Sequence, residues 1–402
     1  MSEDFVPVAR PLLGQEEVSA AERAILSGWV TQGPEVAAFE REFAAFVGSA
    51  YACAVSSGTT ALHLALLAVG VRPGDEVITV SHSYIATANS VRYCGARPVF
   101  VDIDPATFNI NPQRIEAAIS DRTRAILCVH QMGMPCDLEE VLKVARRHGL
   151  AVVEDAACAI GSEILWNGRW EKIGKPHADV ACFSFHPRKL LTTGDGGMLT
   201  TPDAAMDRKF RLWRQHGMTV PDTVRHASPV VVFESYPEFG FNYRLTDIQA
   251  AVGREQLKRI PEAVHERRRL SDRYRELLSD IEDVKLPEEP EWARTNWQSY
   301  CVRLSEHFDQ RQVMQRMLDD GIATRRGIMC AHREPAYGDP SSWRCAQAQC
   351  NPSPHCPNLI ESEKAQDFGI ILPLFSQMTE RQQERVVDSL RAVCSANVNA
   401  AD

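Results

Sequence analysis

Short apolar segments rich in valine and isoleucine alternate with amphipathic segments between about residues 50 and 200. The apolar segments have the length of buried strands, whereas TTALHLALLAVG (59–70) and LEEVLKVARRHG (138–149) have the apolar spacing of helices. This alternation predicts an α/β fold in which a mostly parallel mixed sheet lies between layers of helices. The expected strands are EVITV (76–80), RPVFVDI (97–103), RAILCV (124–129), LAVVED (150–155), DVACFSF (179–185) and GMLTT (197–201).

The pattern changes after about residue 240, where long helical segments lead out of the strand-rich region. These are TDIQAAVGREQLKRI (246–260) and EAVHERRRLSDRYRELL (262–278), followed by the break LPEEPEW, the strand SYCVRL (299–304) and the closing helix TERQQERVVDSLRAV (379–393). A chain of 402 residues is long enough for two domains. We therefore expect an N-terminal arm and large domain over residues 1–250, and a linking helix and small α+β domain over 251–402.

Charge and hydropathy argue against two classes of partner. The net charge of −9 disfavours a nucleic-acid partner bound through its phosphates. No run of about 18 apolar residues is present, which disfavours a membrane span. The first residues, MSEDFVPVARPLLGQEE, lack the apolar core of a signal peptide. We expect a cytoplasmic protein that acts on small molecules.

The twelve cysteines are scattered through apolar segments, which favours buried thiols in a reducing compartment. One group stands apart in CAQAQCNPSPHC, where Cys345, Cys350 and Cys356 lie near His355. This group lacks the paired C-x2-C spacing of structural zinc sites. We therefore expect an irregular loop with spare thiols and no metal.

A lysine follows the strand DVACFSF in the stretch FSFHPRKLLTTGDGG (183–197). Ser184, His186 and Lys189 come within six residues of one another, at the end of a strand where a functional crevice is expected. Most lysines are solvated surface charges, and a neighbouring histidine is more often a packing residue than a catalytic one. The TTGDGG segment lacks the GK[ST] ending of a P-loop, so its glycines are expected to permit close approach behind the lysine.

Three other segments supply groups with which Lys189 could form a cofactor site. In SSGTTALHLAL (56–66), a turn of small residues opens a helix whose N–H groups suit a phosphate, although the same residues also form ordinary N-caps. Asp155 ends the strand LAVVED, and Tyr84 in SHSYIATAN follows the strand EVITV. Together a lysine, a strand-end carboxylate, an aromatic ring and a phosphate cradle are what pyridoxal phosphate (PLP) requires.

The chain resembles the DegT/DnrJ/EryC1/StrS family of sugar aminotransferases, which are fold-type I PLP enzymes. The resemblance covers nearly the whole chain. It rests on nine blocks in family order: SGWVTQGPEVAAFEREFAAFVG, SSGTTALHLAL, VDIDPATFNI, VHQMGMPCD, VEDAACAIGS, FSFHPRKLLTTGDGG, RQHGM, GFNYRLTDIQAAVG and ILPLFSQMT.

The resemblance implies a role for each matching residue. Lys189 resembles the Schiff-base lysine and proton shuttle, and Asp155 the partner of the pyridine nitrogen. Tyr84 matches the aromatic residue that stacks on the ring. The residues implied at the phosphate are Gly58, Thr59, Thr60 and Ser184, with Asn242 reaching the cofactor of a neighbouring subunit. This last residue implies a homodimer with shared active sites.

Two places depart from the family pattern. Position 158 is often glutamine or histidine in the family and contacts the oxygen on the cofactor ring, whereas this chain has Cys158, a weak donor. In GIATRRGIMCAHREPAYG, His332 and Tyr337 match the outline of a substrate segment, but Arg325 and Arg326 do not. These arginines are either contacts for a diphosphate or a solvated pair at a strand end.

The resemblance implies transfer of an amino group from L-glutamate or glutamine to a keto sugar, and most of all to a nucleotide-linked 4-keto-6-deoxyhexose. Retention of Lys189 argues against the dehydratase branch of the family, in which histidine replaces this lysine. Three alternatives stay open: amination of a cyclitol ketone, aromatisation of a cyclic amino-acid precursor, and a PLP-binding regulator without catalysis.

Overall fold

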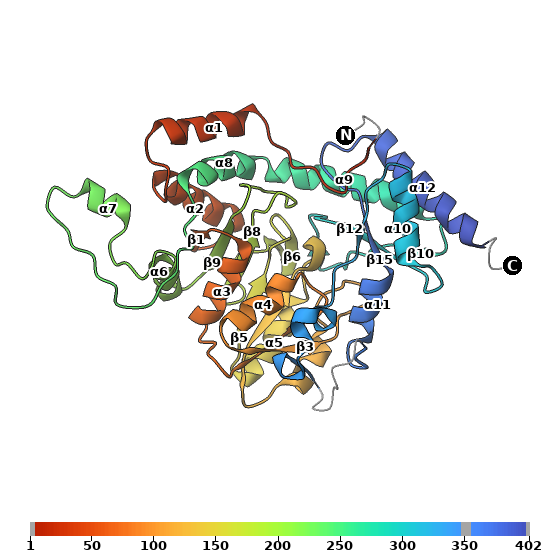
Figure 1. The fold of residues 1–402 in the computed structure, drawn as a ribbon, viewed down its shortest axis with the longest axis horizontal. Coiled ribbons are helices and arrows are strands. Elements are labelled where there is room, and N and C mark those ends of the chain that lie inside the picture. Colours follow the sequence, from red (N-terminus) through yellow and green to blue (C-terminus); the bar gives the residue numbers. More distant parts are fainter. Residues whose placement is uncertain (1–4, 347–354, 399–402) are drawn as a thin grey trace.

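The computed structural model describes residues 5–346 and 355–398 of the chain, and one large sheet lies at its centre (Figure 1). In the described part, eight strands follow the order β1-β9-β8-β5-β4-β2-β3-β14. The pairs from β8 to β14 are parallel, whereas β9 runs antiparallel to β1 and to β8. This mostly parallel sheet confirms the predicted fold class. The strands are β1 (Tyr51–Val55), β2 (Glu76–Val80), β3 (Arg97–Val101), β4 (Thr123–Val129), β5 (Ala151–Asp155), β8 (Val180–Ser184), β9 (Gly197–Thr201) and β14 (Arg344–Cys345).

Helices cover both faces of this sheet, because alternate residues of its strands enter two different hydrophobic clusters. Ile126 and Cys128 pack in the cluster that contains the phenylalanines of α2 (Pro34–Val47). Ala125 and Leu127 pack in the cluster that contains the leucines of α3 (Gly58–Ala68). Strands that are buried on both faces read as continuous apolar runs, which is why the sequence located them well.

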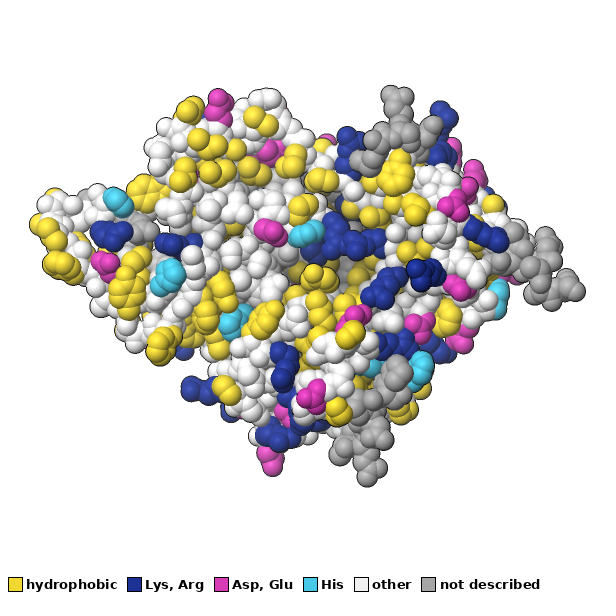
Figure 2. Space-filling model, viewed as in Figure 1, with side chains coloured by type: hydrophobic (Ala, Val, Ile, Leu, Met, Phe, Trp, Pro, Cys, Tyr) yellow, Lys and Arg dark blue, Asp and Glu magenta, His cyan; other side chains and the backbone are white. Residues whose placement is uncertain are grey.

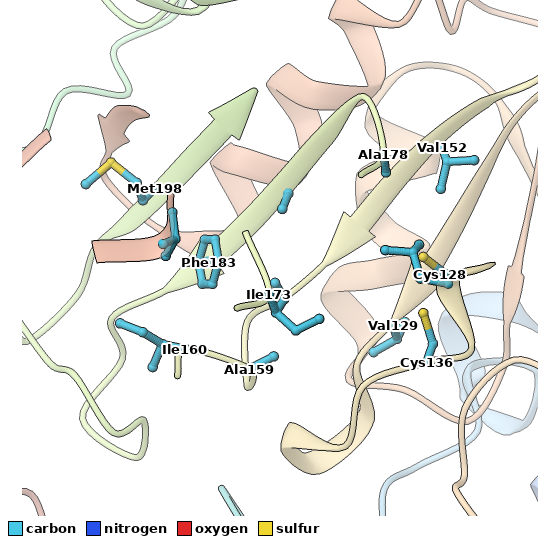
Figure 3. Packing of buried hydrophobic residues seen from close by; sticks show 14 of the residues in the cluster. Cys128, Val129, Cys136, Val152, Ala159, Ile160, Ile173, Ala178, Phe183 and Met198 are labelled. Carbon is cyan, nitrogen blue, oxygen red and sulfur yellow. The ribbon is translucent and has the colours of Figure 1, made fainter. Parts of the chain in front are cut away.

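The alternation on β8 decides which way its polar end points. Phe183 and Phe185 belong to the cluster under α2, and Figure 3 shows Phe183 near Met198, its register partner on β9. Cys182 belongs to the cluster under α3. Because side chains of a strand alternate between faces, Ser184 shares the face of Cys182 and points towards α3.

A second sheet follows the order β10-β12-β15-β13, with all neighbouring strands antiparallel. Its strands are β10 (Val284–Lys285), β12 (Tyr300–Leu304), β13 (Arg325–Arg326) and β15 (Gly369–Leu372). Apolar residues of three helices pack beside it, together with Val6 of the N-terminal segment. The helices are α9 (Ile260–Leu278), α10 (Gln310–Asp319) and α12 (Glu380–Val398).

Two short strands link the C-terminal half to the N-terminal half. The strand β14 pairs with β3 of the large sheet, and β11 (Ala293–Arg294) pairs with β6 (Glu163–Trp166). In turn, β6 forms a hairpin with β7 (Arg169–Lys172). Short strands of this kind carry no periodicity in the sequence, and the domain boundary at residue 250 stays a prediction.

The remaining described helices surround these two sheets. Figure 1 shows α1 lying along α8. It also shows α7 standing apart from the body of the molecule, on the long segment of residues 214–246 between α6 and α8, which we call the excursion. Within the described residues, no helix is long and apolar enough to cross a membrane. The helices are α1 (Gln15–Leu26), α4 (Ile85–Tyr93), α5 (Leu138–His148), α6 (Ala204–Trp213), α7 (Asp222–Ala227), α8 (Asp247–Lys258) and α11 (Ile360–Phe368).

Most cysteines in the described part are buried, as the sequence predicts, but Cys158 is half-buried. Ten cysteines in the described part form no disulfide, whereas Cys345 is disulfide-bonded. The predicted free thiol is therefore wrong at Cys345, whose environment on β14 the sequence did not reveal. Cys350 lies outside the described residues, and among those described no group of three or more metal-ligating side chains could hold an ion.

Candidate active site

Lys189 lies in a tight loop that follows β8. The amide of Phe185 donates to the carbonyl of Gly196 at 2.8 Å, and the amide of Thr193 donates to the carbonyl of Phe185 at 3.1 Å. These two bonds hold the ends of the loop together. The side chain of Lys189 is half-buried, and its Nζ donates to Sγ of Cys158 at 2.9 Å. The departure at position 158 is therefore in direct contact with the predicted Schiff-base lysine.

Asp155 ends β5, which is the strand beside β8, and its carboxylate is buried. Its Oδ2 accepts a hydrogen bond from Oγ1 of Thr87 at 2.7 Å, and its Oδ1 accepts one from the amide of Ala157 at 3.2 Å. Burial raises the pKa of Asp155, although these two bonds and the nearby charge of Lys189 act in the opposite direction. The structure thus brings Asp155 and Lys189 into one electrostatic environment.

The start of α4 is tied to Asp155 through two hydroxyl groups. The hydroxyl of Thr87 donates its proton to Asp155, so its oxygen can only accept from the hydroxyl of Ser83. The two hydroxyl oxygens are 2.7 Å apart. Tyr84 is the N-cap residue of this helix and leaves 64% of its surface exposed. The helix that carries Tyr84 is therefore anchored at Asp155, while the tyrosine ring remains free to stack on a flat ligand.

The start of α3 meets the end of β8 at very close range. A Cβ atom added to Gly58 would lie 2.7 Å from Cβ of Ser184, so only glycine fits at this position. Ser57 caps the helix, since its Oγ accepts the amide of Thr60 at 3.1 Å, and Oγ1 of Thr60 donates to the carbonyl of Ser57 at 2.8 Å. In the described part of the chain, the amides of Gly58 and Thr59 have no acceptor.

The N-cap is therefore confirmed, and phosphate binding at this turn stays a prediction. The hydroxyl of Thr60 serves the N-cap, whereas the amides of Gly58 and Thr59 and the hydroxyl of Ser184 remain available. Unpaired helix amides carry a partial positive charge that favours a phosphate group.

Two residues from the C-terminal half hold the backbone on either side of this site. The side chain of Gln298 accepts from the amide of Leu190 at 3.1 Å and donates to the carbonyl of Arg188 at 2.6 Å, which clamps the residues flanking Lys189. The side chain of Asn296 donates to the carbonyl of Cys158 at 2.8 Å. The segment Asn296–Gln298 thus fixes the lysine and its cysteine neighbour together.

Comparison with known proteins agrees with this geometry. The profile of the DegT/DnrJ/EryC1/StrS aminotransferase family matches residues 11–391. The chain belongs to this family. GDP-perosamine synthase from Caulobacter vibrioides is 39% identical over 392 residues, which cover 96% of this chain and 98% of that protein. The solved structure of the aminotransferase TlmJ from Streptoalloteichus hindustanus has a TM-score of 0.86 at 31% identity, and covers 98% of this chain and 100% of TlmJ.

The chain is therefore a sugar aminotransferase that depends on PLP. Spr1654 from Streptococcus pneumoniae, solved in a PLP form, has the same fold with a TM-score of 0.85 at 24% identity, over 98% of this chain and 99% of that one. The predicted family, fold, enzyme class and cofactor are confirmed. The amino donor and the particular sugar are finer statements that belong to a proposal.

The residues of this chain fit the cofactor. Close packing of Gly58 against Ser184 leaves a cradle that a Cβ would fill, and the unpaired amides there suit the phosphate group. The carboxylate of Asp155 is buried and feels the nearby charge of Lys189, and among the described residues the Nζ of Lys189 has Cys158 as its hydrogen-bond partner. When bound, PLP supplies a ring that takes up electrons from the carbon carrying the amine.

Other predicted residues lie in contacts of their own. His332 is buried, with Nδ1 2.6 Å from Oγ of Ser81 and Nε2 3.1 Å from a carboxylate oxygen of Glu363. Tyr337 is buried and donates to Oδ1 of Asn89 at 2.9 Å. These bonds fix their segment against the end of β2 and against α4. A direct contact of His332 or Tyr337 with substrate stays a prediction.

The two arginines of β13 are exposed, and Arg326 forms an ion pair with Glu334 at 3.3 Å. Both interpretations of Arg325 and Arg326 therefore stay open. His186 is half-buried, and its Nδ1 accepts from the amide of Arg188 at 3.2 Å. Burial, followed by the charge of Arg188, lowers the pKa of His186. This contact gives the histidine a structural role in the loop that carries Lys189.

Asn242 is exposed at the end of the excursion that carries α7. The carbonyl of the next residue, Tyr243, accepts from the amide of Ser56 at 2.8 Å, which places this end of the excursion beside the start of α3. The side chain of Asn242 accepts from Arg244 at 3.3 Å. Its predicted contact with a second subunit is not tested within one chain.

Proposed function

We propose that this sugar aminotransferase takes an amino group from L-glutamate and transfers it to a nucleotide-linked 4-keto-6-deoxyhexose in the cytoplasm. The observation that carries the proposal is the 39% identity to GDP-perosamine synthase over almost the whole of both chains. The name of that relative gives a nucleotide-linked sugar as its product. The similarity spans both halves of the chain, so it includes the elements that surround the site.

In this proposal each residue acts at a stated atom. The Nζ of Lys189 would take the proton from the donor carbon that bears the amine, and would return a proton to the sugar carbon that receives it, while the bound cofactor carries the amino group between the two. The carboxylate of Asp155 keeps the pyridine nitrogen protonated. The amides of Gly58 and Thr59 and the hydroxyl of Ser184 hold the phosphate, and Tyr84 covers the ring. Gln298 positions Lys189 from outside the site through the bonds to its neighbours.

Two half-reactions followed separately test this function. We expect L-glutamate to change the absorbance of the bound cofactor, and a GDP- or dTDP-linked 4-keto-6-deoxyhexose to restore it, with an amino sugar detected by mass spectrometry. A cyclitol ketone is the matched acceptor control. If only the cyclitol ketone restores the absorbance, the acceptor is a cyclitol and not a nucleotide-linked sugar. Bound cofactor without any change on addition of amino donors would indicate a regulator.

We also propose that the enzyme is a homodimer in which the excursion around α7 covers a second copy. Several apolar side chains of this excursion are almost fully exposed, and Figure 2 shows a part of them at the far end of the molecule. Phe239 is 100% exposed, Phe233 88% and Val231 83%. Apolar side chains gathered in this way mark an interface with another protein surface. The excursion ends beside α3, which would bring the second copy close to the site.

Replacing Phe233 and Phe239 together with serine is expected to convert the dimer into a monomer. Analytical ultracentrifugation measures the mass, and loss of cofactor on gel filtration reports whether the shared site has opened. Leu318→Ser is the matched control, because Leu318 is 47% exposed on α10 and away from the excursion. A wild-type protein that sediments as a monomer while fully active would contradict the proposal.

A further inference from the structure

A hollow with a strongly basic lining opens beside Lys189. It lies between the N-terminal segment, the helices α8 and α9, and the loop after β8. Figure 2 shows Lys and Arg side chains gathered near the middle of one face of the molecule, below α9. None of the lining residues is acidic. They are Arg10, Pro11, Leu12, Lys189, Leu190, Gln256, Arg259, Ile260, Ala263, Arg267 and Ser376.

Arg267 is the most unusual of these residues, because its side chain lies on the buried face of α9. Its Nη1 donates to the carbonyls of Trp297 at 2.9 Å and Gln298 at 3.2 Å, but its Nε has no partner in the described part of the chain. Among the described residues, no carboxylate forms an ion pair with it, and burial lowers the pKa of Arg267 to about 10. A buried cation without a counter-charge is costly, so the site favours an incoming anion.

The other two arginines of the lining differ in how far their charge is compensated. Arg259 forms ion pairs with Glu16 at 2.9 Å and with Glu17 at 3.2 Å, which compensate its charge. Arg10 is exposed, and no described carboxylate forms an ion pair with it. The hydroxyl of Ser376 lies in the same lining. The hollow therefore keeps a net positive charge that the described residues do not neutralise.

We infer that this hollow binds a carboxylate group of the amino donor, with Arg267 and Arg10 as its cationic partners. The inference rests on the proposed function and assigns a place to the donor. Gln298 lies between Arg267 and the residue that follows Lys189: its side chain accepts from the amide of Leu190, and its backbone carbonyl accepts from Nη1 of Arg267. In an amino acid, one carbon separates the α-amine from the α-carboxylate. An α-carboxylate held in the hollow therefore leaves the amine beside Lys189.

A sugar diphosphate fits this position less well. The whole hexose ring lies between the diphosphate and the reacting ketone at C4, so a diphosphate receiver belongs farther from the lysine. Arg325 and Arg326 on β13 are exposed and do not line the hollow. The donor carboxylate and the sugar diphosphate are therefore expected to bind different arginines. Substitution of one set of arginines at a time distinguishes the two sites.

The experiment compares Arg10→Gln, Arg267→Gln and Arg267→Lys in the cofactor-loaded enzyme. Arg268→Gln is the matched control, because Arg268 lies next on α9 and donates to backbone carbonyls at Thr295 and Arg294 without lining the hollow. Binding of glutarate, a dicarboxylate that has no amine to transfer, is measured by isothermal titration calorimetry. The concentration of L-glutamate that half-saturates the first half-reaction is measured alongside.

Both glutamine variants are expected to weaken glutarate binding, and to raise the half-saturating L-glutamate concentration, by about tenfold or more, since each removes a charge-assisted contact. Arg267→Lys keeps the charge and is expected to recover part of this loss, and Arg268→Gln to leave both values unchanged. If Arg267→Gln fails to fold, Arg10→Gln at the exposed mouth carries the comparison.

Unchanged glutarate and L-glutamate values in Arg10→Gln and Arg267→Gln would overturn the inference. A raised half-saturating concentration of the keto sugar, with the donor unaffected, would assign the hollow to the acceptor instead. If the wild-type enzyme binds glutarate but transfers no amine from L-glutamate, the proposed donor is wrong while the carboxylate site stands.

Discussion

Lys189→Ala is expected to lower the rate of both half-reactions by at least about 10⁴-fold, since one substitution removes the covalent attachment and the proton shuttle together. The Nζ of Lys189 donates to Sγ of Cys158 at 2.9 Å. The backbone on both sides of this lysine is clamped by Gln298. Stopped-flow absorbance of the bound cofactor with L-glutamate measures the loss.

Chemical rescue distinguishes this role from a merely structural one. A small amine such as methylamine fits the space left by the lysine side chain and can carry the proton, so we expect partial recovery of the rate in Lys189→Ala. Lys143→Ala is the matched control, because Lys143 lies on the exposed face of α5 and forms ion pairs with its helix neighbours Glu139 and Glu140. Full turnover in Lys189→Ala without added amine would contradict the assigned chemistry.

The parts of the fold that the sequence predicted are those with strong periodicity. The strands β2, β3, β4, β5, β8 and β9 lie within two residues of their predicted bounds, and so do the long helices α8 and α9. Each is long enough for its apolar pattern to be recognised in the sequence. The strands β11 and β14 have two residues each and form because the chain is already packed beside β6 and β3. Their partners, and not their own side chains, determine them.

The site divides in the same way. Lys189 and Asp155 could be singled out because Asp155 ends β5 and Lys189 follows the end of β8, and neighbouring parallel strands bring their ends together. Thr87, Asn296 and Gln298 were missed, because their roles depend on hydrogen bonds to residues that are 68, 138 and 108 positions away. One feature of the sequence pointed to Thr87: it lies three positions after Tyr84, in the first turn of the same helix.

Arg267 left a clearer signal in the helix 262–278. It falls between Val264 and Leu270, at the three-residue spacing of the buried positions of α9. A charged residue at a position that helical spacing assigns to the core needs a partner or a ligand. The many arginines around it hid this exception, because the helix as a whole reads as solvated.

Asp155→Asn is expected to lower kcat/KM by about 10²–10³-fold, the range for loss of one preorganised electrostatic contact, while the protein keeps its thermal stability. Burial raises the pKa of Asp155, which means that the folded chain alone disfavours the ionised carboxylate. A neutral amide of the same shape removes that penalty and can still accept from Thr87. A fall in activity together with an unchanged or raised melting temperature therefore assigns the charge to function, whereas a lowered melting temperature with normal activity would contradict it.

Thr87→Val tests the same carboxylate without replacing it. The hydrogen bond from Thr87 to Oδ2 of Asp155, 2.7 Å long, favours the ionised form, so its loss raises the pKa of Asp155 further. Because the ionised form is the active one, activity should fall at a higher pH than in the wild type as the solution is made more acidic. The acidic limb of the kcat/KM profile measures this shift, and Ser90→Ala, whose hydroxyl donates to the carbonyl of Thr87, is the control on the same helix. An acidic limb at the wild-type pH in Thr87→Val, with Asp155→Asn still impaired, would mean that the bound cofactor and not the hydrogen bond keeps Asp155 ionised.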